Sequence, residues 1–288
     1  MKLEGRVAIV TGASRGLGQA IATRFVDEGA DIMLVARDEA VLRTTAKCLA
    51  SKRPRSAQRV LYQAADVSVK EHVARVVDAT LAALGGVDVL VCNAGVQGPI
   101  GRLEDLAFDD WVRAIEVNLF GSVLCCQAVV PTMRRQQRGK IVLLSGGGAT
   151  RARPRLTAYA ASKAAVVRFA ETLALELEGS GIEVNAVAPG PLNTQLLDEL
   201  QTVGPDRLGE AEYAQVVRYR TEGGVPLEIP AQLVTFLASS ESDGISGRLL
   251  SAIWDPWHNL PALRERLARS DVYTLRRIEP ADRGWEAP

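Results

Sequence analysis

The sequence predicts an α/β fold, a doubly wound parallel sheet of about seven strands (a Rossmann fold) in a single domain. Two observations support this class. Short apolar runs alternate with stretches of helical periodicity along most of the chain. Near-continuous apolar runs of four or five residues suit a parallel sheet buried on both faces. Their alternation with helices is typical of right-handed strand-helix-strand crossovers.

The predicted elements follow one another in a regular order. The apolar runs lie at 7–10, 32–35, 60–62, 87–91, 141–144 and 184–187. Ser68 and Glu71 match a capping box at the start of a helix that Gly85 and Gly86 end. Longer helices are predicted from about 109 toward 131 and over about 157–178, and a last strand over 248–254.

Composition excludes several classes of protein. The 288 residues carry 34 basic and 34 acidic side chains, which argues against nucleic acid or an anionic membrane as the main partner. No apolar run approaches the roughly 18 residues of a membrane span, and we expect no signal peptide. The four cysteines form no C-x-x-C pair, so we predict reduced thiols, no metal site and a cytoplasmic protein.

A glycine-rich turn, TGASRGLG at 11–18, joins the first strand to the first helix. Glycines let the backbone approach a ligand, and a helix N-terminus offers N–H groups and a positive dipole end to a pyrophosphate. The turn also matches the G-x-S-x-G elbow of hydrolases around Ser14. A hydrolase would need a histidine at the strand ends. His72 lies on the polar side of a predicted helix and His258 lies in the C-terminal tail, so the hydrolase is the weaker alternative.

Further motifs follow in order: Asn93-Ala94-Gly95, then Asn118, then Tyr159-x-x-x-Lys163, then Pro189-Gly190 with Thr194. Together with the glycine turn, this set resembles the short-chain dehydrogenase/reductase family, in its TGxxxGxG and YxxxK branch, over roughly residues 5–254. The resemblance implies an oxidoreductase (EC 1.1.1.-) that transfers a hydride between a nicotinamide cofactor and a carbonyl or alcohol. It also implies a homodimer or homotetramer.

The chemistry of Tyr159 and Lys163 can be argued from their spacing. Residues four apart share one face of a helix. A phenol has a pKa near 10, and a nearby ammonium group favours the phenolate and lowers that pKa. Tyr159 would then exchange a proton with the substrate oxygen as general acid and base.

The resemblance implies further roles. Lys163 would also hold the nicotinamide ribose, Asn118 would position a water in a proton relay, and Asp66 with Val67 would contact adenine. The predicted cofactor-binding residues are Gly12, Ser14, Arg15, Gly16, Leu17, Gly18, Arg37, Asp66, Val67, Asn93, Ala94, Gly95, Tyr159, Lys163, Pro189, Gly190 and Thr194.

One position departs from the family pattern. The family usually places a catalytic serine 13 residues before the tyrosine, where this chain has Gly146, and Ser145 stands one position early. Either a one-residue bulge brings Ser145 into the catalytic role, which we favour, or the role is absent. A second departure is Cys92, where the family often has another asparagine. The main alternative function is therefore an NADP(H)-binding sensor or scaffold with weakened catalysis.

The end of the second predicted strand bears on the choice of cofactor. A site for NAD typically has a carboxylate near this strand end, which accepts a hydrogen bond from the ribose 2′-hydroxyl. Position 36 of this chain is alanine. Arg37, joined by Arg15, can pair with a 2′-phosphate, whereas Asp38 is expected to point away. NADP(H) is therefore favoured over NAD(H).

The resemblance implies a small carbonyl or alcohol as the substrate. Arg151, Arg153 and Arg155 precede Tyr159, and we hypothesise that Arg151 or Arg153 binds a carboxylate or phosphate of an anionic substrate near Gly146. The alternative is a solvated or inter-subunit loop.

These motifs set the predicted domain boundaries. Residues 1–254 form the dinucleotide-binding and catalytic domain, and 191–225, rich in Gly and Pro after a strand end, form a substrate lid. Residues 255–288 form a C-terminal extension whose tryptophans are hypothesised to pack on a neighbouring subunit.

Overall fold

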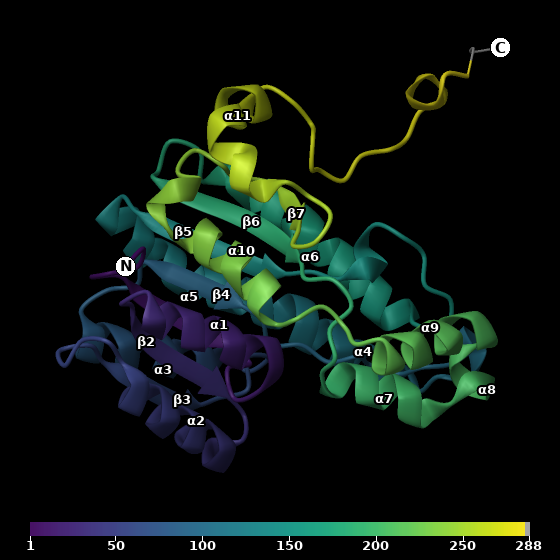
Figure 1. Ribbon diagram of the computed structural model, residues 1–288, viewed down its shortest axis with the longest axis horizontal. Coiled ribbons are helices and arrows are strands. Elements are labelled where there is room, and N and C mark those ends of the chain that lie inside the picture. The colour runs from purple at the N-terminus through teal and green to yellow at the C-terminus, as the bar shows by residue number, and fades with distance from the viewer. Residues whose placement is uncertain (286–288) are drawn as a thin grey trace.

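Seven parallel strands form one sheet in the computed structural model, which describes residues 1–285 (Figure 1). The strand order is β3-β2-β1-β4-β5-β6-β7. The strands are β1 Val7–Thr11, β2 Asp31–Ala36, β3 Val60–Ala64, β4 Val89–Cys92, β5 Gly139–Leu144, β6 Ile182–Ala188 and β7 Leu249–Ser251. The order reverses between β1 and β4, which opens a ligand crevice at the carboxyl ends of the strands. The predicted single α/β domain is confirmed.

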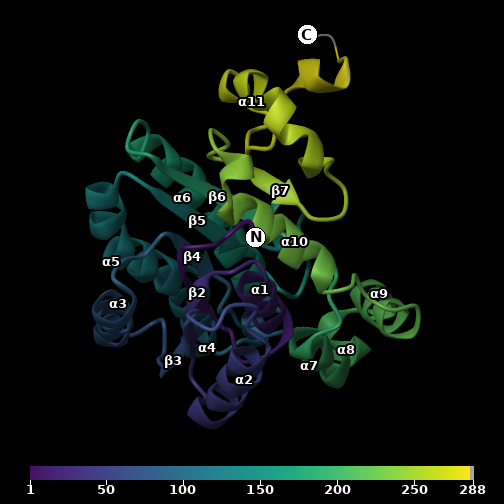
Figure 2. The ribbon, with the colours of Figure 1, turned by 60° about the vertical axis from the view of Figure 1, so that its left-hand side comes forward.

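Helices cover both faces of this sheet, as Figure 2 shows edge-on. One face packs against α1 Gly16–Asp27, α2 Glu39–Lys52 and α10 Glu228–Ala238. The other packs against α3 Lys70–Leu84, α5 Gly121–Gln136 and α6 Thr157–Glu176. Successive side chains of β1 alternate between the two layers: Ala8 and Val10 enter the first and Ile9 the second. Both layers are apolar, so the central strands have no polar face. For this reason the strands could be predicted from apolar runs in the sequence.

The long helix predicted toward residue 131 is a composite. It consists of α4 Phe108–Ile115, the π-helical turn η2 Glu116–Phe120, and α5. A π-helical turn inside a longer helix is frequent at functional sites, and this one contains Asn118. The stretch 108–136 is long and apolar enough to cross a membrane, but α5 packs against the sheet as a core helix.

The helix α3 ends as predicted and begins differently. Gly85 caps its C-terminus with φ of 85°, a left-handed conformation that favours glycine. The predicted capping box at its start is wrong, because α3 begins at Lys70 and Val69 occupies the N-cap. The Ser68 hydroxyl instead donates to Asp66 Oδ1 at 2.6 Å. The carboxylate two residues earlier is the stronger acceptor for this hydroxyl.

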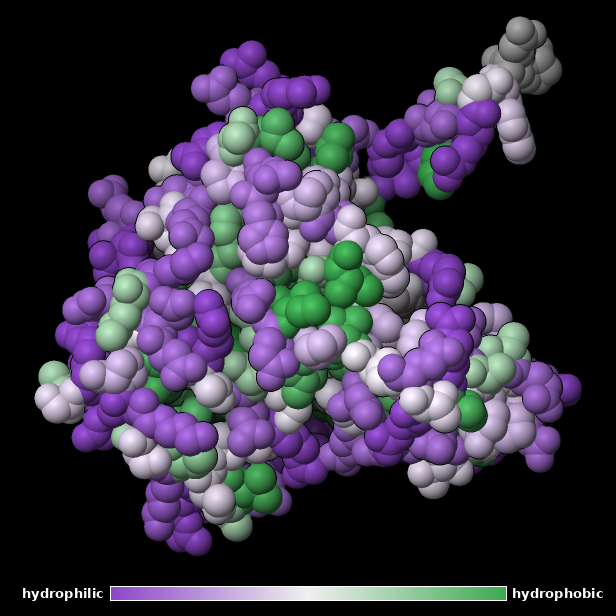
Figure 3. Space-filling model, in the orientation of Figure 1, coloured by the Kyte–Doolittle hydropathy of each residue, from purple (hydrophilic) through white to green (hydrophobic). Residues whose placement is uncertain are grey.

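The segment predicted as a lid contains three short helices beyond the carboxyl ends of the strands (Figure 1). They are α7 Gln195–Val203, α8 Pro205–Leu208 and α9 Glu210–Thr221. Their inner side chains form an apolar cluster around Tyr159, named here the lid cluster and composed of Ile100, Leu156, Tyr159, Leu197, Leu200, Leu208 and Val216. Figure 3 shows that apolar surface also gathers where the lid helices approach α10.

The C-terminal extension packs against α10 and β7 of the same chain. Trp257, in η5 Trp257–Asn259, is buried against Phe236 of α10 with ring centres 5.5 Å apart. The α11 helix, Leu260–Ala268, follows, and Tyr273 O accepts from Leu249 N of β7 at 2.7 Å. This contact covers the edge of the sheet. Contact with a neighbouring subunit stays a prediction, and residues 286–288 of the extension lie outside the described residues.

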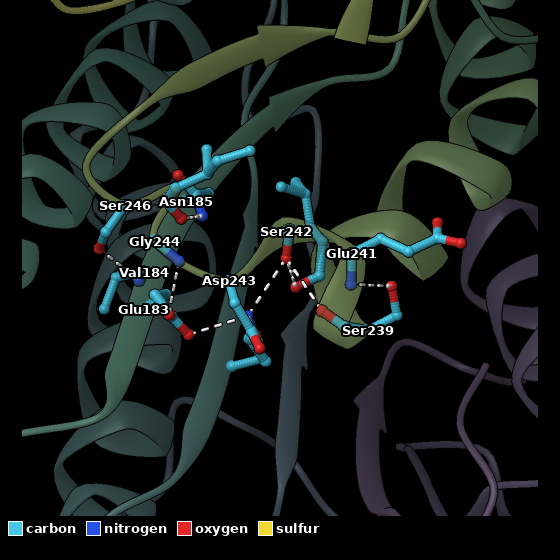
Figure 4. Close-up of polar contacts among 12 residues, drawn as sticks. Glu183, Val184, Asn185, Ser239, Glu241, Ser242, Asp243, Gly244 and Ser246 are labelled. Atoms are coloured by element: carbon cyan, nitrogen blue, oxygen red, sulfur yellow. Dashed lines mark hydrogen bonds and ion pairs between the residues drawn. The ribbon is translucent and has the colours of Figure 1, made fainter. Parts of the chain in front are cut away.

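Buried charges at the amino end of the sheet are paired. Lys140 Nζ, on β5, lies 2.9 Å from Glu183 Oε2 and 2.7 Å from Asp243 Oδ1. Ser242 adds a hydroxyl at 3.3 Å, and Figure 4 shows Glu183, Ser242 and Asp243 converging here. Asp88 accepts from Val7 N at 2.9 Å and from Arg138 Nε at 2.7 Å. The buried charges of Lys140 and Asp88 at this end of the sheet are therefore satisfied within the protein.

Candidate active site

The glycine-rich turn between β1 and α1 is a close-packed cradle. Gly12 and Gly16 have φ of 64° and 54°, which L side chains rarely adopt. A Cβ on Gly18 would overlap Gly12 O and the Asn93 amide. That amide donates to Thr11 O at 3.0 Å and Gly12 O at 3.2 Å, so the turn is fixed to the end of β4.

The first turn of α1 faces this cradle without a side-chain cap. Arg15 occupies the N-cap position and offers no capping hydrogen bond. The α1 helix has 12 residues, and its first N–H groups and dipole favour an anion at this end. The turn therefore fits the pyrophosphate of a dinucleotide, which Gly12, Ser14, Gly16, Leu17 and Gly18 would hold.

The motif after β4 links the turn to the catalytic helix. Thr11 Oγ1 accepts from Asn93 N and from Ala94 N, each at 3.0 Å. A Cβ on Gly95 would lie 3.1 Å from Asn118 Oδ1 and 3.5 Å from Lys163 Nζ. The structure thus brings Gly95, Asn118 and Lys163 together at the carboxyl end of the sheet.

The two charged residues that follow β2, Arg37 and Asp38, have different surroundings. Arg37 is exposed and makes no hydrogen bond or ion pair with any residue from 1 to 285. Asp38 caps α2 by accepting from Val41 N at 3.1 Å. Arg15, the second arginine predicted here, donates to Gln195 Oε1 of the lid at 2.6 Å.

Asp66 is held rigidly at the end of β3. Its carboxylate accepts from Ser68 and from Arg113 Nη2 of α4, the latter at 2.6 Å. Burial acts to raise the pKa of Asp66, but these hydrogen bonds outweigh it and lower the pKa. The neighbouring Val67 is buried, and its side chain lies under Gly121.

Tyr159 and Lys163 lie on one face of α6, as their spacing predicted. Lys163 Nζ is 5.8 Å from the centre of the Tyr159 ring. Lys163 is buried and donates to Leu144 O at 2.9 Å. Burial disfavours the ammonium form and lowers the pKa of Lys163 to about 8.

The pKa of Tyr159 differs from the expectation of a lowered value. The ring is 9% exposed under the lid cluster, and burial raises the pKa of the phenol. The positive charge of Arg153, whose guanidinium carbon is 5.8 Å from the ring centre, acts in the opposite direction. In the protein without cofactor the effect of burial on the pKa of Tyr159 is the larger one, because a phenolate in an apolar cluster loses its hydration.

Asn118 uses its whole side-chain amide. Oδ1 accepts from Val96 N at 2.8 Å, and Nδ2 donates to Val96 O at 3.0 Å and to Ser162 Oγ at 2.9 Å. These bonds hold the loop after β4 against α6. The implied role in a proton relay stays a prediction.

Gly146, rather than Ser145, adjoins the phenol. The Ser145 hydroxyl is buried and donates to Lys163 O at 3.3 Å. A Cβ on Gly146 would collide with Tyr159 Oη. Gly146 is extended, with φ of −176° and ψ of 172°, so the side chains of positions 145 and 146 point in opposite directions.

The three arginines before Tyr159 have different surroundings. Arg151 is exposed. Arg153 is mostly buried and forms an ion pair with Glu212 of α9. Arg155, with φ of 69°, donates to Asp206 O and Arg207 O at 3.3 and 3.4 Å. The Arg153 guanidinium lies over the Tyr159 ring, 5.8 Å from its centre.

The segment after β6 leads from the carboxyl end of the sheet into the helices that were predicted as a lid. Gly190 follows Pro189 with φ of 89° and is enclosed by Val225 and Ile253. Thr194 precedes α7, and its methyl group would lie 3.5 Å from a Cβ on Gly16. The base of the lid therefore meets the glycine-rich turn.

Two residues near the site were missed by sequence reasoning. Glu212 carries no motif signal. Gln97 is 3% exposed, and its Nε2 has no hydrogen-bond partner among the described residues. It lies between Val96, bonded to Asn118, and Gly98, against Ala158. Its position two residues after Asn93-Ala94-Gly95 at a strand end is the signal that could have found it.

Neither histidine supports the hydrolase alternative. His72 Nδ1 accepts from Asp66 N at 3.2 Å. His258 stacks on Trp257 with ring centres 3.4 Å apart, in the C-terminal extension. Ser14 lies in the glycine turn, where the helix N-terminus suits an anion.

Comparisons with known proteins agree with this geometry. The model of the family described as short chain dehydrogenase matches residues 6–203. A 3-oxoacyl-(acyl-carrier-protein) reductase of Thermotoga maritima is 35% identical over 250 residues, covering 87% of this chain and 97% of the relative.

Two solved structures are similar throughout the fold. One is an NAD⁺-bound xylitol dehydrogenase, with a TM-score of 0.79 and 28% identity, covering 87% of this chain and 98% of the other. The other is a gluconate 5-dehydrogenase from Burkholderia cenocepacia in complex with NADP and tartrate, with a TM-score of 0.76 and 29% identity, covering 87% and 94%. The two carry different nicotinamide cofactors.

Proposed function

Because this chain belongs to the short-chain dehydrogenase/reductase family, we propose that it uses NADP(H) in preference to NAD(H) and that Tyr159 exchanges the proton. The chain is an oxidoreductase that acts on an alcohol or carbonyl substrate with a nicotinamide cofactor. The preference for NADP(H) rests on one observation: at the end of β2, Arg37 has no partner among residues 1–285, and the Asp38 carboxylate caps α2.

The end of β2 supports a 2′-phosphate. The side chain of Ala36 cannot accept a hydrogen bond from a ribose hydroxyl, and Asp38 Oδ1 caps α2. Arg37 is exposed and free to pair with a phosphate, which guanidinium recognises bidentately. Arg15 can join it if the contact with Gln195 yields.

Tyr159 is the group placed to move the proton. The bound nicotinamide supplies hydride transfer. Tyr159 gives its phenolic proton to a carbonyl oxygen during reduction and takes it from an alcohol during oxidation. Lys163, held by Leu144 O, stabilises the phenolate that forms.

The serine contact of the family is absent in this proposal. Ser145 faces the backbone of α6, and Gly146 has no side chain to donate. Gln97 is the candidate for a replacement donor, because a buried amide N–H without a partner is costly unless a ligand satisfies it.

The test is fluorescence titration with NADPH and NADH, on the wild type and on Arg37→Ala. Arg37→Ala is expected to weaken NADPH binding about 10- to 100-fold, the value of a hydrogen-bonded charge pair, and to leave NADH binding unchanged. Arg53→Ala, at the far end of α2, is the matched control and should change neither.

A substrate panel completes the test. Turnover with NADPH that Tyr159→Phe abolishes supports the assignment of the proton donor. Tighter binding of NADH than NADPH would overturn the cofactor proposal. Binding of cofactor with no turnover across a broad panel of ketones and alcohols would favour the NADP(H)-binding sensor, which Gly146 makes the second candidate.

A further inference from the structure

An ion pair joins the lid to the loop before Tyr159. Arg153 Nε donates to Glu212 Oε1 at 3.1 Å, and Nη2 donates to the same oxygen. The side chains are only 15% and 16% exposed. Arg153 comes from the loop between η3 (Gly147–Ala149) and α6, and Glu212 comes from α9.

The surroundings of this pair are apolar. The guanidinium lies 5.8 Å from the centre of the Tyr159 ring, beside the lid cluster. Desolvating two charges in such a place cancels most or all of their attraction, so the pair contributes little to stability. A second ion pair at the C-terminal end of α9, Arg218 with Glu222, is 64% and 67% exposed and has no such cost.

The pair also leaves binding capacity unused. Both bonds end on Glu212 Oε1, so the fork of the guanidinium does not meet both carboxylate oxygens. Arg153 Nη1 makes no hydrogen bond with any residue that the structure describes. An anion that used two oxygens would therefore bind Arg153 with better geometry than Glu212 does.

Building on the proposed function, we propose that Arg153 binds an anionic group of the substrate and that Glu212 occupies this position until the substrate displaces it. The substrate is then an alcohol or ketone that carries a carboxylate or phosphate only a few bonds from the reacting carbon. Its remaining atoms would be apolar, to match Leu156, Leu197 and Leu208 of the lid cluster. Arg153 sets the specificity for an anionic substrate. Glu212, by pairing with Arg153 until that substrate arrives, keeps neutral molecules away from the guanidinium.

The test compares a keto acid with its neutral methyl ester, assayed with NADPH. Arg153→Gln is expected to raise KM for the acid at least about tenfold, because a charged hydrogen bond is lost, and to change KM for the ester less than twofold. Glu212→Gln is expected to lower KM for the acid several-fold, because the competing carboxylate is gone. Arg153→Lys should recover part of the affinity for the acid.

Opposite effects of the two variants distinguish this role from a simple latch. If the pair only held the lid shut, Arg153→Gln and Glu212→Gln would act in the same direction and equally on acid and ester, which would overturn the proposal. Glu222→Gln, the same change at the exposed pair of α9, is the matched control and should alter neither KM.

Binding measurements cover the case in which no panel member is turned over. Malonate and inorganic phosphate are titrated into the NADPH-loaded protein by calorimetry, which distinguishes a carboxylate site from a phosphate site. Tighter binding of one anion to Glu212→Gln and weaker binding to Arg153→Gln supports the proposal. Equal binding to all three proteins overturns it and leaves the proposed oxidoreductase function standing. Failure of NADPH to bind would instead count against the function itself.

Discussion

The two ends of the sheet differ in how their buried charged side chains are paired. At the amino end, Lys140 meets two carboxylates and a hydroxyl, and Asp88 meets a backbone N–H and a guanidinium. At the carboxyl end, Lys163 has one backbone acceptor. There the Tyr159 hydroxyl and Gln97 Nε2 have no partner within residues 1–285. Lys140 and Asp88 are bound within the protein at the amino end. Lys163, Tyr159 and Gln97 keep polar groups available for ligands at the carboxyl end.

The difference has a physical cause. Buried polar groups cost free energy unless they are hydrogen-bonded, so removing a partner from Lys140 or Asp88 is costly, whereas the unpaired groups of Tyr159 and Gln97 add nothing to stability. Substitutions at the amino end should therefore reduce stability and spare activity. Substitutions at the carboxyl end should reduce activity and spare or raise stability.

Tyr159→Phe should give the largest effect. It removes the proton donor, and general acid–base catalysis contributes about 10²- to 10⁴-fold, so we expect kcat to fall by that factor. Because the hydroxyl has no partner in the described structure, the free energy of unfolding should change little. Steady-state kinetics and chemical denaturation measure the two effects. A large loss of stability would show that the hydroxyl is structural.

Lys163→Met should lower kcat less than Tyr159→Phe does and should stabilise the protein. Burial lowers the pKa of Lys163 from 10.5 to about 8, so at pH 7 the folded state bears a charge at a cost on the order of 3 kcal/mol. Between pH 8 and 10.5 the unfolded chain binds more protons than the folded one. The wild type therefore gains stability as the pH rises through this range.

The measurement for Lys163→Met is denaturation at a series of pH values. The variant should exceed the wild type in free energy of unfolding at pH 7, and its advantage should shrink from about pH 8 upward. Lys140→Met is the control at the other end of the sheet, where the ammonium group is paired, and it should be destabilising. A pH-independent gain for Lys163→Met would contradict the assigned cause.

Asp88→Ala tests the amino end. It leaves Val7 N without its acceptor and Arg138 without its partner, so we expect a loss of about 2 kcal/mol in the free energy of unfolding. The site is at the opposite end of the strands, and kcat should stay within twofold. Urea denaturation and steady-state kinetics check both. A large fall in kcat at unchanged stability would show that the two ends are coupled.

The sequence predicted the sheet well because its signal is local. Apolar runs such as 141–144 identify strands buried on both faces, and the glycine-rich turn marks where the first helix begins. Gly and Pro after β6 marked the segment 191–225, which contains α7, α8 and α9, and its role as a substrate lid stays a prediction. These features depend on nearest neighbours along the chain.

The missed features depend on contacts across the chain. Ser68 satisfies Asp66 instead of capping α3, and the pattern alone cannot rank two acceptors. Ser145 and position 146 point in opposite directions from an extended backbone, so a shift of one residue turns the hydroxyl away from the phenol. Glu212 meets Arg153 only because α9 lies beside the loop that precedes α6, 59 residues earlier in the chain.

Gly146→Ala should lower kcat less than Tyr159→Phe or Lys163→Met, and it tests the unpaired phenol at the carboxyl end directly. The extended backbone accepts alanine, but the added Cβ would collide with Tyr159 Oη, so the phenol must move. We expect kcat to fall several-fold while NADPH affinity and the free energy of unfolding change by less than about 1 kcal/mol, since the hydroxyl has no partner to lose. Gly147→Ala is the matched control, because a Cβ there meets no described atom within 4 Å. An unchanged kcat in Gly146→Ala would mean that the phenol adapts freely. The carboxyl end would then tolerate displacement of the very group whose unpaired state distinguishes it from the amino end.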